Sequence, residues 1–394
     1  MINYGNLTVS KYARVLCLNN QCVIGNIATD GRWIKIPRNT WDHIISILNS
    51  SDFDGLSDEN IAKAIKVLHE IHVLVDESES VDDLPIHIKP YDVTIELTTQ
   101  CNLRCKHCSY SFGGQKYNEI SYENIIALAR WCSRNNVKRI LITGGEPFCR
   151  KDIWKVIKDI RDFYKGSLEI ITNGTLIDKS DVFNIIKYID RLHISLDGYD
   201  EKSVAAIRGC NVFERVVTVI KELQANQFKN ISLSCVDTGD QKKIERFNDL
   251  TNKLKVKSVV RKLNLKGQAN KNFRYENSDT HQLISEKGTS MKSICNHIYS
   301  SLFVNTYGKV FPCAALREME YNIGIFSAEK GEFELNIDSM IPIVDTIDEC
   351  STCNVRYFCA TPCISQNDVI YLSKEYRKQR CESLHDILFS IVWE

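Results

Sequence analysis

The 394-residue sequence lacks an excess of charge of either sign, because 50 lysines and arginines are balanced by 50 aspartates and glutamates. A protein that binds nucleic acid usually carries a basic patch, so this balance predicts no nucleic-acid partner. No uninterrupted apolar run approaches the roughly 18 residues that span a bilayer. The N-terminus also lacks the charged and then apolar segments of a secretory signal. We therefore expect a cytoplasmic protein with no membrane partner.

Cysteine, by contrast, is abundant, with 16 copies in the chain. Disulfides do not persist in the cytosol, so metal ligation is the first explanation for so many thiols. Cys101, Cys105 and Cys108 form the segment C-N-L-R-C-K-H-C. Three thiolates can hold three corners of a 4Fe–4S cube and leave the fourth iron open to a small molecule, which indicates an enzyme. A zinc knuckle is the alternative for this triplet.

The middle of the chain alternates between strand and helix patterns. A helix over 122–134 would begin after the capping residue Ser121. Strands are expected at 93–97, 139–143, 168–172, 192–196, 231–236 and 258–263, and helices at 122–134, 152–164, 182–188, 213–225 and 244–254. This alternation predicts an α/β fold with a parallel sheet covered by helices. The pattern alone does not decide whether the sheet closes.

Glycine-rich and polar segments follow the predicted strands, where parallel α/β folds place their chemistry. Glycines let the backbone approach a ligand, and a carboxylate can accept hydrogen bonds from an ammonium group. The residues in question are Gly144, Gly145 and Glu146 in G-G-E-P, Asn173 in T-N-G, Ser195 and Asp197 in S-L-D-G, and Arg208. Each short segment alone is typical of a turn, but their order after the cysteine triplet favours a site.

The triplet and these segments resemble the radical S-adenosylmethionine (SAM) superfamily. The resemblance implies a partial (β/α)6 TIM-type barrel in which Cys101, Cys105 and Cys108 hold the catalytic 4Fe–4S cluster. SAM would bind the open iron and break to a 5′-deoxyadenosyl radical that takes hydrogen from the substrate. By position, the cofactor contacts would be Gly144, Gly145 and Glu146 on the amino group, Ser195 and Asp197 on the ribose, Arg208 on the carboxylate, and Asn173 beside them.

A second set of cysteines lies in the last third of the chain. The pattern is Cys295, G-x4-C ending at Cys313, C-x2-C-x5-C-x3-C at Cys350, Cys353, Cys359 and Cys363, and finally Cys381. It resembles the SPASM domain, whose cysteines hold two auxiliary 4Fe–4S clusters. By position, Cys350, Cys353, Cys359 and Cys381 would hold the distal cluster, and Cys295, Cys313 and Cys363 the proximal one. A zinc ribbon is the alternative.

The proximal set provides only three cysteines. Either another group, with His297 nearest in sequence, completes the proximal cluster, or one iron is open. Our hypothesis is an open iron that takes a substrate thiolate. The remaining six cysteines share no spacing and are expected to be structural filler: Cys17, Cys22, Cys132, Cys149, Cys210 and Cys235.

Residues 6–76 have a different character, with a hairpin over 7–18 and 21–26, a strand at 33–36, and helices at 41–48 and 60–74. Asn39 is expected to cap the first helix. An acidic run over 76–83 reads as a linker. The arrangement resembles the winged-helix leader-recognition domain of enzymes that modify ribosomal peptides, akin to the peptide chaperone of pyrroloquinoline quinone synthesis. A DNA-binding winged helix is less favoured, because such a domain needs a basic helix and the helix at 60–74 has only two lysines, Lys63 and Lys66, and no arginine.

The expected organisation is therefore a leader-binding domain at 1–84, a radical SAM barrel at 85–280 and an Fe–S SPASM domain at 281–394. The resemblance implies a peptide-modifying radical SAM enzyme with three 4Fe–4S clusters, SAM, a precursor peptide and a reducing partner such as flavodoxin or ferredoxin. We favour an intramolecular thioether as the product. A carbon–carbon crosslink, an anaerobic sulfatase-type maturase and a non-catalytic Fe–S peptide sensor are the alternatives.

Overall fold

The computed structural model describes most of the chain. Cys295, Cys363, His297 and residues 77–83 of the acidic run lie outside the described residues, so the predictions made for them concern parts that the structure does not describe. The described residues are 6–27, 29–50, 58–76, 90–113, 116–273, 290–291, 300–317, 321–336, 343–346, 348–359 and 374–394.

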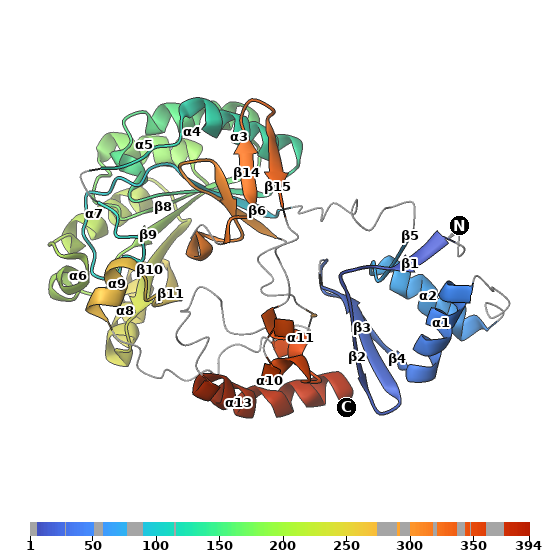
Figure 1. Ribbon diagram of the computed structural model, residues 1–394. Coiled ribbons are helices and arrows are strands. Elements are labelled where there is room, and N and C mark those ends of the chain that lie inside the picture. The colour runs from blue at the N-terminus through green and yellow to red at the C-terminus, as the bar shows by residue number, and fades with distance from the viewer. Residues whose placement is uncertain are drawn as a thin grey trace.

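A parallel sheet of six strands in sequence order forms the centre of the fold, and helices connect its strands (Figure 1). The strands are β6 (Asp92–Glu96), β7 (Arg139–Thr143), β8 (Ser167–Thr172), β9 (Arg191–Ser195), β10 (Ile231–Asp237) and β11 (Lys257–Lys262). The helices are α3 (Tyr122–Arg134), α4 (Ile153–Phe163), α5 (Lys179–Tyr188), α6 (Glu201–Arg208), α7 (Phe213–Ala225) and α8 (Gln241–Leu254). The predicted α/β alternation is confirmed.

Alternating side chains give the sheet two unlike faces. Val93 and Ile95 of β6 join Ile140 and Ile142 of β7 in the main hydrophobic core under the helices. The intervening residues, such as Thr94, point to the opposite face. Ser121 caps α3 as predicted, since its Oγ accepts a hydrogen bond from the Asn124 amide at 3.1 Å. The main core therefore fixes one face of the sheet and leaves the other for a site.

The sheet continues beyond the predicted domain boundary at residue 280. β12 (Ser301–Val304) pairs in parallel with β6, and β13 (Lys309–Phe311), β14 (Gly324–Ser327) and β15 (Glu332–Leu335) follow in antiparallel order. At the other edge, β11 pairs only with β10 among the described strands. The first strands after residue 300 therefore share one sheet with the parallel strands.

The N-terminal region forms its own small unit. An antiparallel sheet of β2 (Ala13–Leu18), β3 (Gln21–Asn26) and β4 (Trp33–Pro37) packs against α1 (Arg38–Ser50) and α2 (Glu59–Glu70). The predicted first strand is broken, because β1 (Leu7–Val9) pairs with β5 (Leu74–Asp76) instead. The prediction for Asn39 is wrong: α1 already begins at Arg38, so Asn39 lies in its first turn, where its Oδ1 accepts from the Thr40 amide at 2.9 Å.

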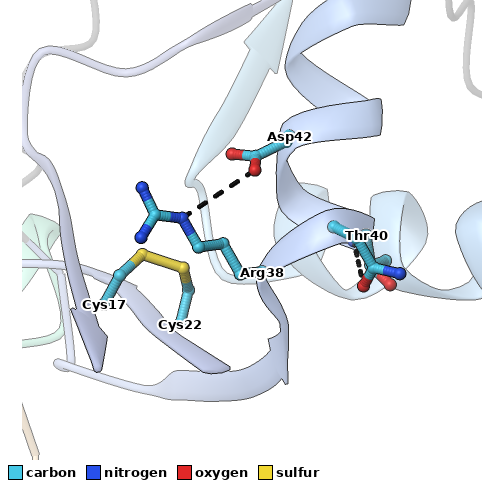
Figure 2. The surroundings of a disulfide bond; sticks show 6 residues. Cys17, Cys22, Arg38, Thr40 and Asp42 are labelled. Carbon is cyan, nitrogen blue, oxygen red and sulfur yellow. Dashed lines mark hydrogen bonds and ion pairs between the residues drawn. A yellow bond between two sulfur atoms is a disulfide. The ribbon is translucent and has the colours of Figure 1, made fainter. Parts of the chain in front are cut away.

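Cys17 and Cys22 form a disulfide across the hairpin, which corrects the prediction that both are structural filler (Figure 2). The two residues are direct partners in the β2–β3 register, with their Cα atoms 4.1 Å apart. Each lies two positions from the Asn19-Asn20 turn, so the hairpin itself brings them face to face.

The other face of the N-terminal sheet packs on the C-terminal segments. Leu16 and Val23 share a hydrophobic cluster with Phe358 of α11 (Arg356–Cys359) and with Leu384 and Leu388 of α13 (Lys374–Trp393). In Figure 1, α10 (Asp348–Ser351), α11 and α13 lie between the N-terminal unit and the parallel sheet. Among the described residues, no helix has the length and apolar character needed to cross a membrane.

Candidate active site

A cavity of about 430 Å³ lies where the parallel strands end, and it collects most of the predicted site residues. Its lining comes from the parallel strands and the loops that follow them, together with the segment after β13. Eight predicted residues line it: Cys101, Cys105, Cys108, Gly144, Gly145, Asn173, Ser195 and Arg208. Glu146 and Asp197 lie behind this lining and are almost fully buried.

Gly144 and Gly145 bring the loop after β7 against the cysteine loop. The Gly145 amide donates to the Thr98 carbonyl at 2.7 Å. A Cβ on Gly144 would lie 2.4 Å from the Thr98 carbonyl oxygen, and one on Gly145 would lie 2.2 Å from that of Gln100. Neither position has room for a side chain, so the glycines are required by the packing of these two loops.

The cysteine loop is held from several directions. The Lys106 amide donates to the Ile207 carbonyl at 2.8 Å, and the Gln268 amide donates to the Cys108 carbonyl at 2.9 Å. Tyr110, just beyond the triplet, donates to the Ala314 carbonyl. The loop is thus tied to α6, to α9 (Gly267–Asn272) and to the segment after β13.

The thiols of the triplet fit a thiolate-bound cluster. Burial raises the pKa of Cys101 to about 11 and that of Cys105 to about 12, so both are protonated at neutral pH and a bound metal would displace their protons. No Asp or Glu is among the described residues that line the cavity. Among the described residues, no three His, Cys, Asp or Glu side chains converge closely enough for a single metal ion. In a 4Fe–4S cluster each thiolate binds its own iron, so its ligands lie farther apart than those of zinc.

The Glu146 carboxylate accepts hydrogen bonds from neighbouring residues of the chain. One oxygen accepts from the Thr172 hydroxyl at 2.7 Å, and the other accepts from the Asn173 amide at 2.6 Å. Burial raises the pKa of this carboxyl group despite these hydrogen bonds. Glu146 therefore joins the loop after β7 to the end of β8, and its predicted contact with SAM stays a prediction.

Arg208 and Asp197 form a buried ion pair beside the triplet. An Arg208 guanidinium nitrogen lies 2.5 Å from Asp197 Oδ2, and Nε donates to the Leu196 carbonyl at 3.1 Å. His107 Nε2 lies 3.3 Å from the same carboxylate, but burial lowers the pKa of His107 and favours its neutral form. Burial opposes ionisation of Asp197, yet its pKa is lowered, and we attribute this to the Arg208 charge. Arg208 therefore lines the cavity, but Asp197 already neutralises much of its positive charge.

The sequence analysis missed several cavity residues, and two of them, Arg261 and Asn264, are polar residues near the end of β11. Arg261 of β11 lines the cavity, and its Nη2 donates to the Ser234 hydroxyl at 3.0 Å. Asn264 follows β11, and its buried Oδ1 has no hydrogen-bond partner among the described residues. The rule that strand ends carry site residues, applied to the sixth predicted strand, would have found both.

A chain of polar side chains lies further along the same face of the sheet and was also missed. Arg139 pairs with Asp92 at 2.5 Å, and Glu169 contacts His193 Nε2 at 2.7 Å. The two pairs are linked by a 3.9 Å approach of Arg139 to Glu169. These contacts join β6, β7, β8 and β9 below the cavity.

The C-terminal cysteines that are described gather in two places. Cys313 precedes Ala314, which lines the cavity beside Tyr110. Cys350, Cys353 and Cys359 pack together on the hydrophobic cluster that includes Phe358 and Leu384. Cys381 lies on α13, which packs against α11, and it is exposed. Cys350, Cys359 and Cys381 therefore lie on the helices α10, α11 and α13, Cys353 lies between α10 and α11, and Cys313 lies next to the cavity.

A second hollow, of about 460 Å³, lies on the N-terminal unit between β4 and α2. Trp33 and Ile34 of β4 form one side, and Val67 and Ile71 of the α2 region form the other. β4 pairs only with β3 among the described strands, so one edge of β4 is open beside this hollow. An extended peptide can add to such an edge through backbone hydrogen bonds.

Comparison with known families covers the cysteine loop and most of the parallel sheet. Residues 95–250 match the family model of the Radical SAM superfamily. The chain contains a radical SAM domain. Its probable GTP 3′,8-cyclase relative from Pyrococcus horikoshii is 35% identical over 137 residues, which are 33% of this chain and 42% of that protein. The mycofactocin maturase MftC of Mycobacterium tuberculosis is 32% identical over 151 residues, 38% of each chain.

Solved structures resemble more of the chain at lower identity. Streptococcus suis SuiB bound to S-adenosylmethionine matches with a TM-score of 0.54 and 18% identity, over 93% of this chain and 97% of that one. The enzyme anSMEcpe with bound AdoMet matches with a TM-score of 0.54 and 16% identity, over 76% and 99%. This likeness shows the fold. The radical SAM domain matches only about two fifths of the length of the first curated relatives, 42% in each case.

Proposed function

We propose that this protein is a radical SAM maturase that installs an intramolecular thioether in a ribosomally made precursor peptide. The observation that carries the proposal is a single cavity lined by the cysteine triplet, by the backbone of Gly144 and Gly145, and by Ala314 beside Cys313. Such a cavity can hold a cofactor next to a peptide. The radical SAM domain is the reason to assign SAM to it.

In this proposal, Cys101, Cys105 and Cys108 hold a 4Fe–4S cluster at the base of the cavity. When bound, the cluster and SAM would supply the radical chemistry that removes one hydrogen atom from a peptide carbon. Loss of the thiol proton and formation of the C–S bond would release a second electron, for which an oxidised iron–sulfur centre would be the acceptor. Gly144 and Gly145 let SAM approach the backbone, and Asn173, Ser195 and Arg208 face it. Glu146 and Asp197 act by positioning Asn173 and Arg208.

The proposal includes two auxiliary 4Fe–4S clusters and the predicted division of the chain into units 1–84, 85–280 and 281–394. The C-terminal unit would be a SPASM domain, and the parallel sheet would form a partial (β/α)6 barrel. Support comes from the packing of Cys350, Cys353 and Cys359 against one cluster of hydrophobic side chains. It also comes from the position of Cys313, which precedes Ala314 at the cavity wall. The open edge of β11 is also compatible with a partial barrel.

The hollow between β4 and α2 is the proposed leader-binding groove of a winged-helix domain. A leader strand would add to β4, while its apolar side chains would contact Val67 and Ile71. This places the added strand on β4 of the sheet, at the edge away from the Cys17–Cys22 hairpin. SuiB has been solved with its precursor peptide SuiA, and anSMEcpe with the Cp18Cys peptide, which supports a peptide as the substrate class here.

The similarity to GTP 3′,8-cyclases does not favour a nucleotide substrate. It covers 33% of this chain, whereas the structural likeness to SuiB extends over 93%. The shared third is the radical SAM domain, which does not by itself choose a substrate. By resemblance, a sulfatase-type maturase would have an Asp after the cysteine at position 313, whereas this chain has Ala314, which lines the cavity.

We also propose that the reaction takes place in the cytoplasm, with a reducing partner such as flavodoxin or ferredoxin. In that compartment the exposed Cys17 would be kept reduced, so the disulfide would form only on oxidation. The proposal therefore does not depend on the Cys17–Cys22 bond.

The experiment is anaerobic incubation of the reconstituted protein with SAM, dithionite and each short peptide encoded beside its gene. A thioether is expected to remove two hydrogen atoms from one peptide and to block alkylation of one cysteine, both visible by mass spectrometry. The same mass loss with every cysteine still alkylated would indicate a carbon–carbon crosslink. An unmodified peptide that binds tightly, without formation of 5′-deoxyadenosine, would indicate a sensor and overturn the proposal.

A further inference from the structure

The charges around the cavity are unevenly balanced. Arg208 is paired with Asp197, whereas Arg261 has no carboxylate within ion-pair distance among the described residues, and the described part of the cavity lining contains no Asp or Glu. The Arg261 side chain is exposed, but its Nη2 is held by the Ser234 hydroxyl, which lies 3.4 Å from the Ser195 hydroxyl. Asp197 also attracts Arg261 through space, but that carboxylate is already paired with Arg208. The direct hydrogen bond to Arg261 comes from a neutral hydroxyl, so much of its charge is available.

Asn264, three residues after Arg261, contributes a hydrogen-bond acceptor to the same cavity. Its Oδ1 is buried and lacks a donor among the described residues, although it lines the same cavity. An unsatisfied buried acceptor is unfavourable, so a bound N–H group would be stabilising there. Arg261 presents donors to an anion, and Asn264 presents an acceptor to an N–H group. An acidic residue of a peptide offers both, through its side-chain carboxylate and its own backbone amide.

We propose that Arg261 and Asn264 form a subsite that recognises an acidic residue of the substrate peptide within the cavity. The proposal rests on the proposed function, because it names a feature of the same substrate. Arg suits this task because its planar fork matches a carboxylate. Arg208 is less suited to the peptide, because the proposed function assigns it to SAM and it is already bound to Asp197 and to the Leu196 carbonyl.

The test uses the oxidised, iron-loaded full chain with SAM and no reductant, so that no turnover occurs. The probes are N-acetyl-aspartate N-methylamide and the matched asparagine compound, and binding is followed by saturation-transfer NMR. We expect the aspartate probe to bind about tenfold more tightly than the asparagine probe. Arg261→Gln should remove this preference, and Arg261→Lys should retain part of it. Asn264→Ala should weaken both probes alike, because both share the backbone amide.

Arg246→Gln is the matched control, since it removes an arginine on α8 that does not line the cavity. Equal binding of the two probes to the wild-type chain would overturn the proposal. A loss of iron in Arg261→Gln would also overturn it, because the Arg261 charge would then be needed to hold the iron–sulfur cluster.

A third arm compares SAM with decarboxylated SAM. Arg261→Gln should bind SAM within about twofold of the wild type. A tenfold loss for SAM alone would assign Arg261 to the cofactor carboxylate and contradict the proposal. Because these measurements need no chemistry, failed peptide modification with intact aspartate preference would count only against the proposed function.

Discussion

The loop of Cys101, Cys105 and Cys108 is fixed by the parallel sheet, whereas Cys350, Cys353 and Cys359 lie on short segments packed against the N-terminal sheet. The first loop is hydrogen-bonded to the strand-end loops and to α6 and α9. The second region depends on side chains from distant parts of the sequence: Trp33 of β4 meets Phe358 edge to face at 5.4 Å, and Arg14 of β2 approaches Asp345 at 3.4 Å.

The two cysteine sites are therefore held in place by different parts of the molecule. The cavity site is built into the sheet and does not require the N-terminal unit. The C-terminal site shares its hydrophobic cluster with Leu16 and Val23, so changes in the N-terminal sheet can reach Cys359 through Phe358. The predictions below test this separation, beginning with the largest expected effect.

Cys105→Ala and Cys353→Ser should each remove a different cluster. We expect each variant to lose about four iron atoms per chain, because each replaced thiolate belongs to a separate set. Iron analysis with EPR of the reduced proteins checks this, and Cys210→Ser is the control that should keep all the iron. Loss of both signals from a single substitution would mean that the two sites are not independent.

Asp197→Asn should destabilise the radical SAM domain strongly. Arg208 is 4% exposed, so removing its partner leaves a buried charge unpaired, at a cost of about 3–5 kcal/mol. Thermal unfolding measures the change. The matched control is Asp200→Asn on the same loop, which should have little effect because Asn also caps a helix well. Equal melting temperatures for Asp197→Asn and the wild type would contradict the structure.

Trp33→Ala should act at the C-terminal site and spare the cavity. The half-buried ring packs on Phe358, so its loss should cost about 2 kcal/mol and loosen the segment that carries Cys359. We expect the auxiliary iron to be lost faster to a chelator, with the iron of the cavity cluster unchanged. Trp154→Ala on α4 is the control within the radical SAM domain. If both tryptophan variants lose auxiliary iron equally, the proposed link between Trp33 and Cys359 is wrong.

Replacing both Cys17 and Cys22 by Ser should have the smallest effect. The bond closes a short loop, so removing it should destabilise the oxidised N-terminal unit by about 2 kcal/mol and leave the iron content unchanged. Thermal melts with and without reductant measure the effect, because the reduced wild type should match the variant. A fall in iron content would show that these cysteines serve a cluster instead.

The parallel sheet was predictable because its signals are local. Each strand is a short apolar run, and each predicted strand lies within one residue of its observed bounds. α6 was missed because eight residues give little periodicity. β12 was missed for a different reason: its partner β6 is distant in sequence, as the 2.6 Å contact between Ser301 and Asp92 illustrates. Long-range pairing leaves no local pattern.

The candidate site was predictable where residue type limits the chemistry, and less so elsewhere. The spacing of the cysteine triplet and of the paired glycines is recognisable in the sequence, and the structure places these residues around one cavity. Arg261 is one of 50 basic residues, and only its place at the end of β11 sets it apart. Cys17 and Cys22 required the register of the predicted hairpin, which was correct but was not used to pair them.

The most direct test is whether the reconstituted wild-type chain, reduced anaerobically with dithionite, cleaves SAM. Liquid chromatography should detect 5′-deoxyadenosine and methionine in equal amounts, together with an EPR signal that changes when SAM is added. Purified protein that holds zinc at the Cys101, Cys105 and Cys108 loop, or holds iron and forms no 5′-deoxyadenosine above the level of Cys105→Ala, would contradict the account.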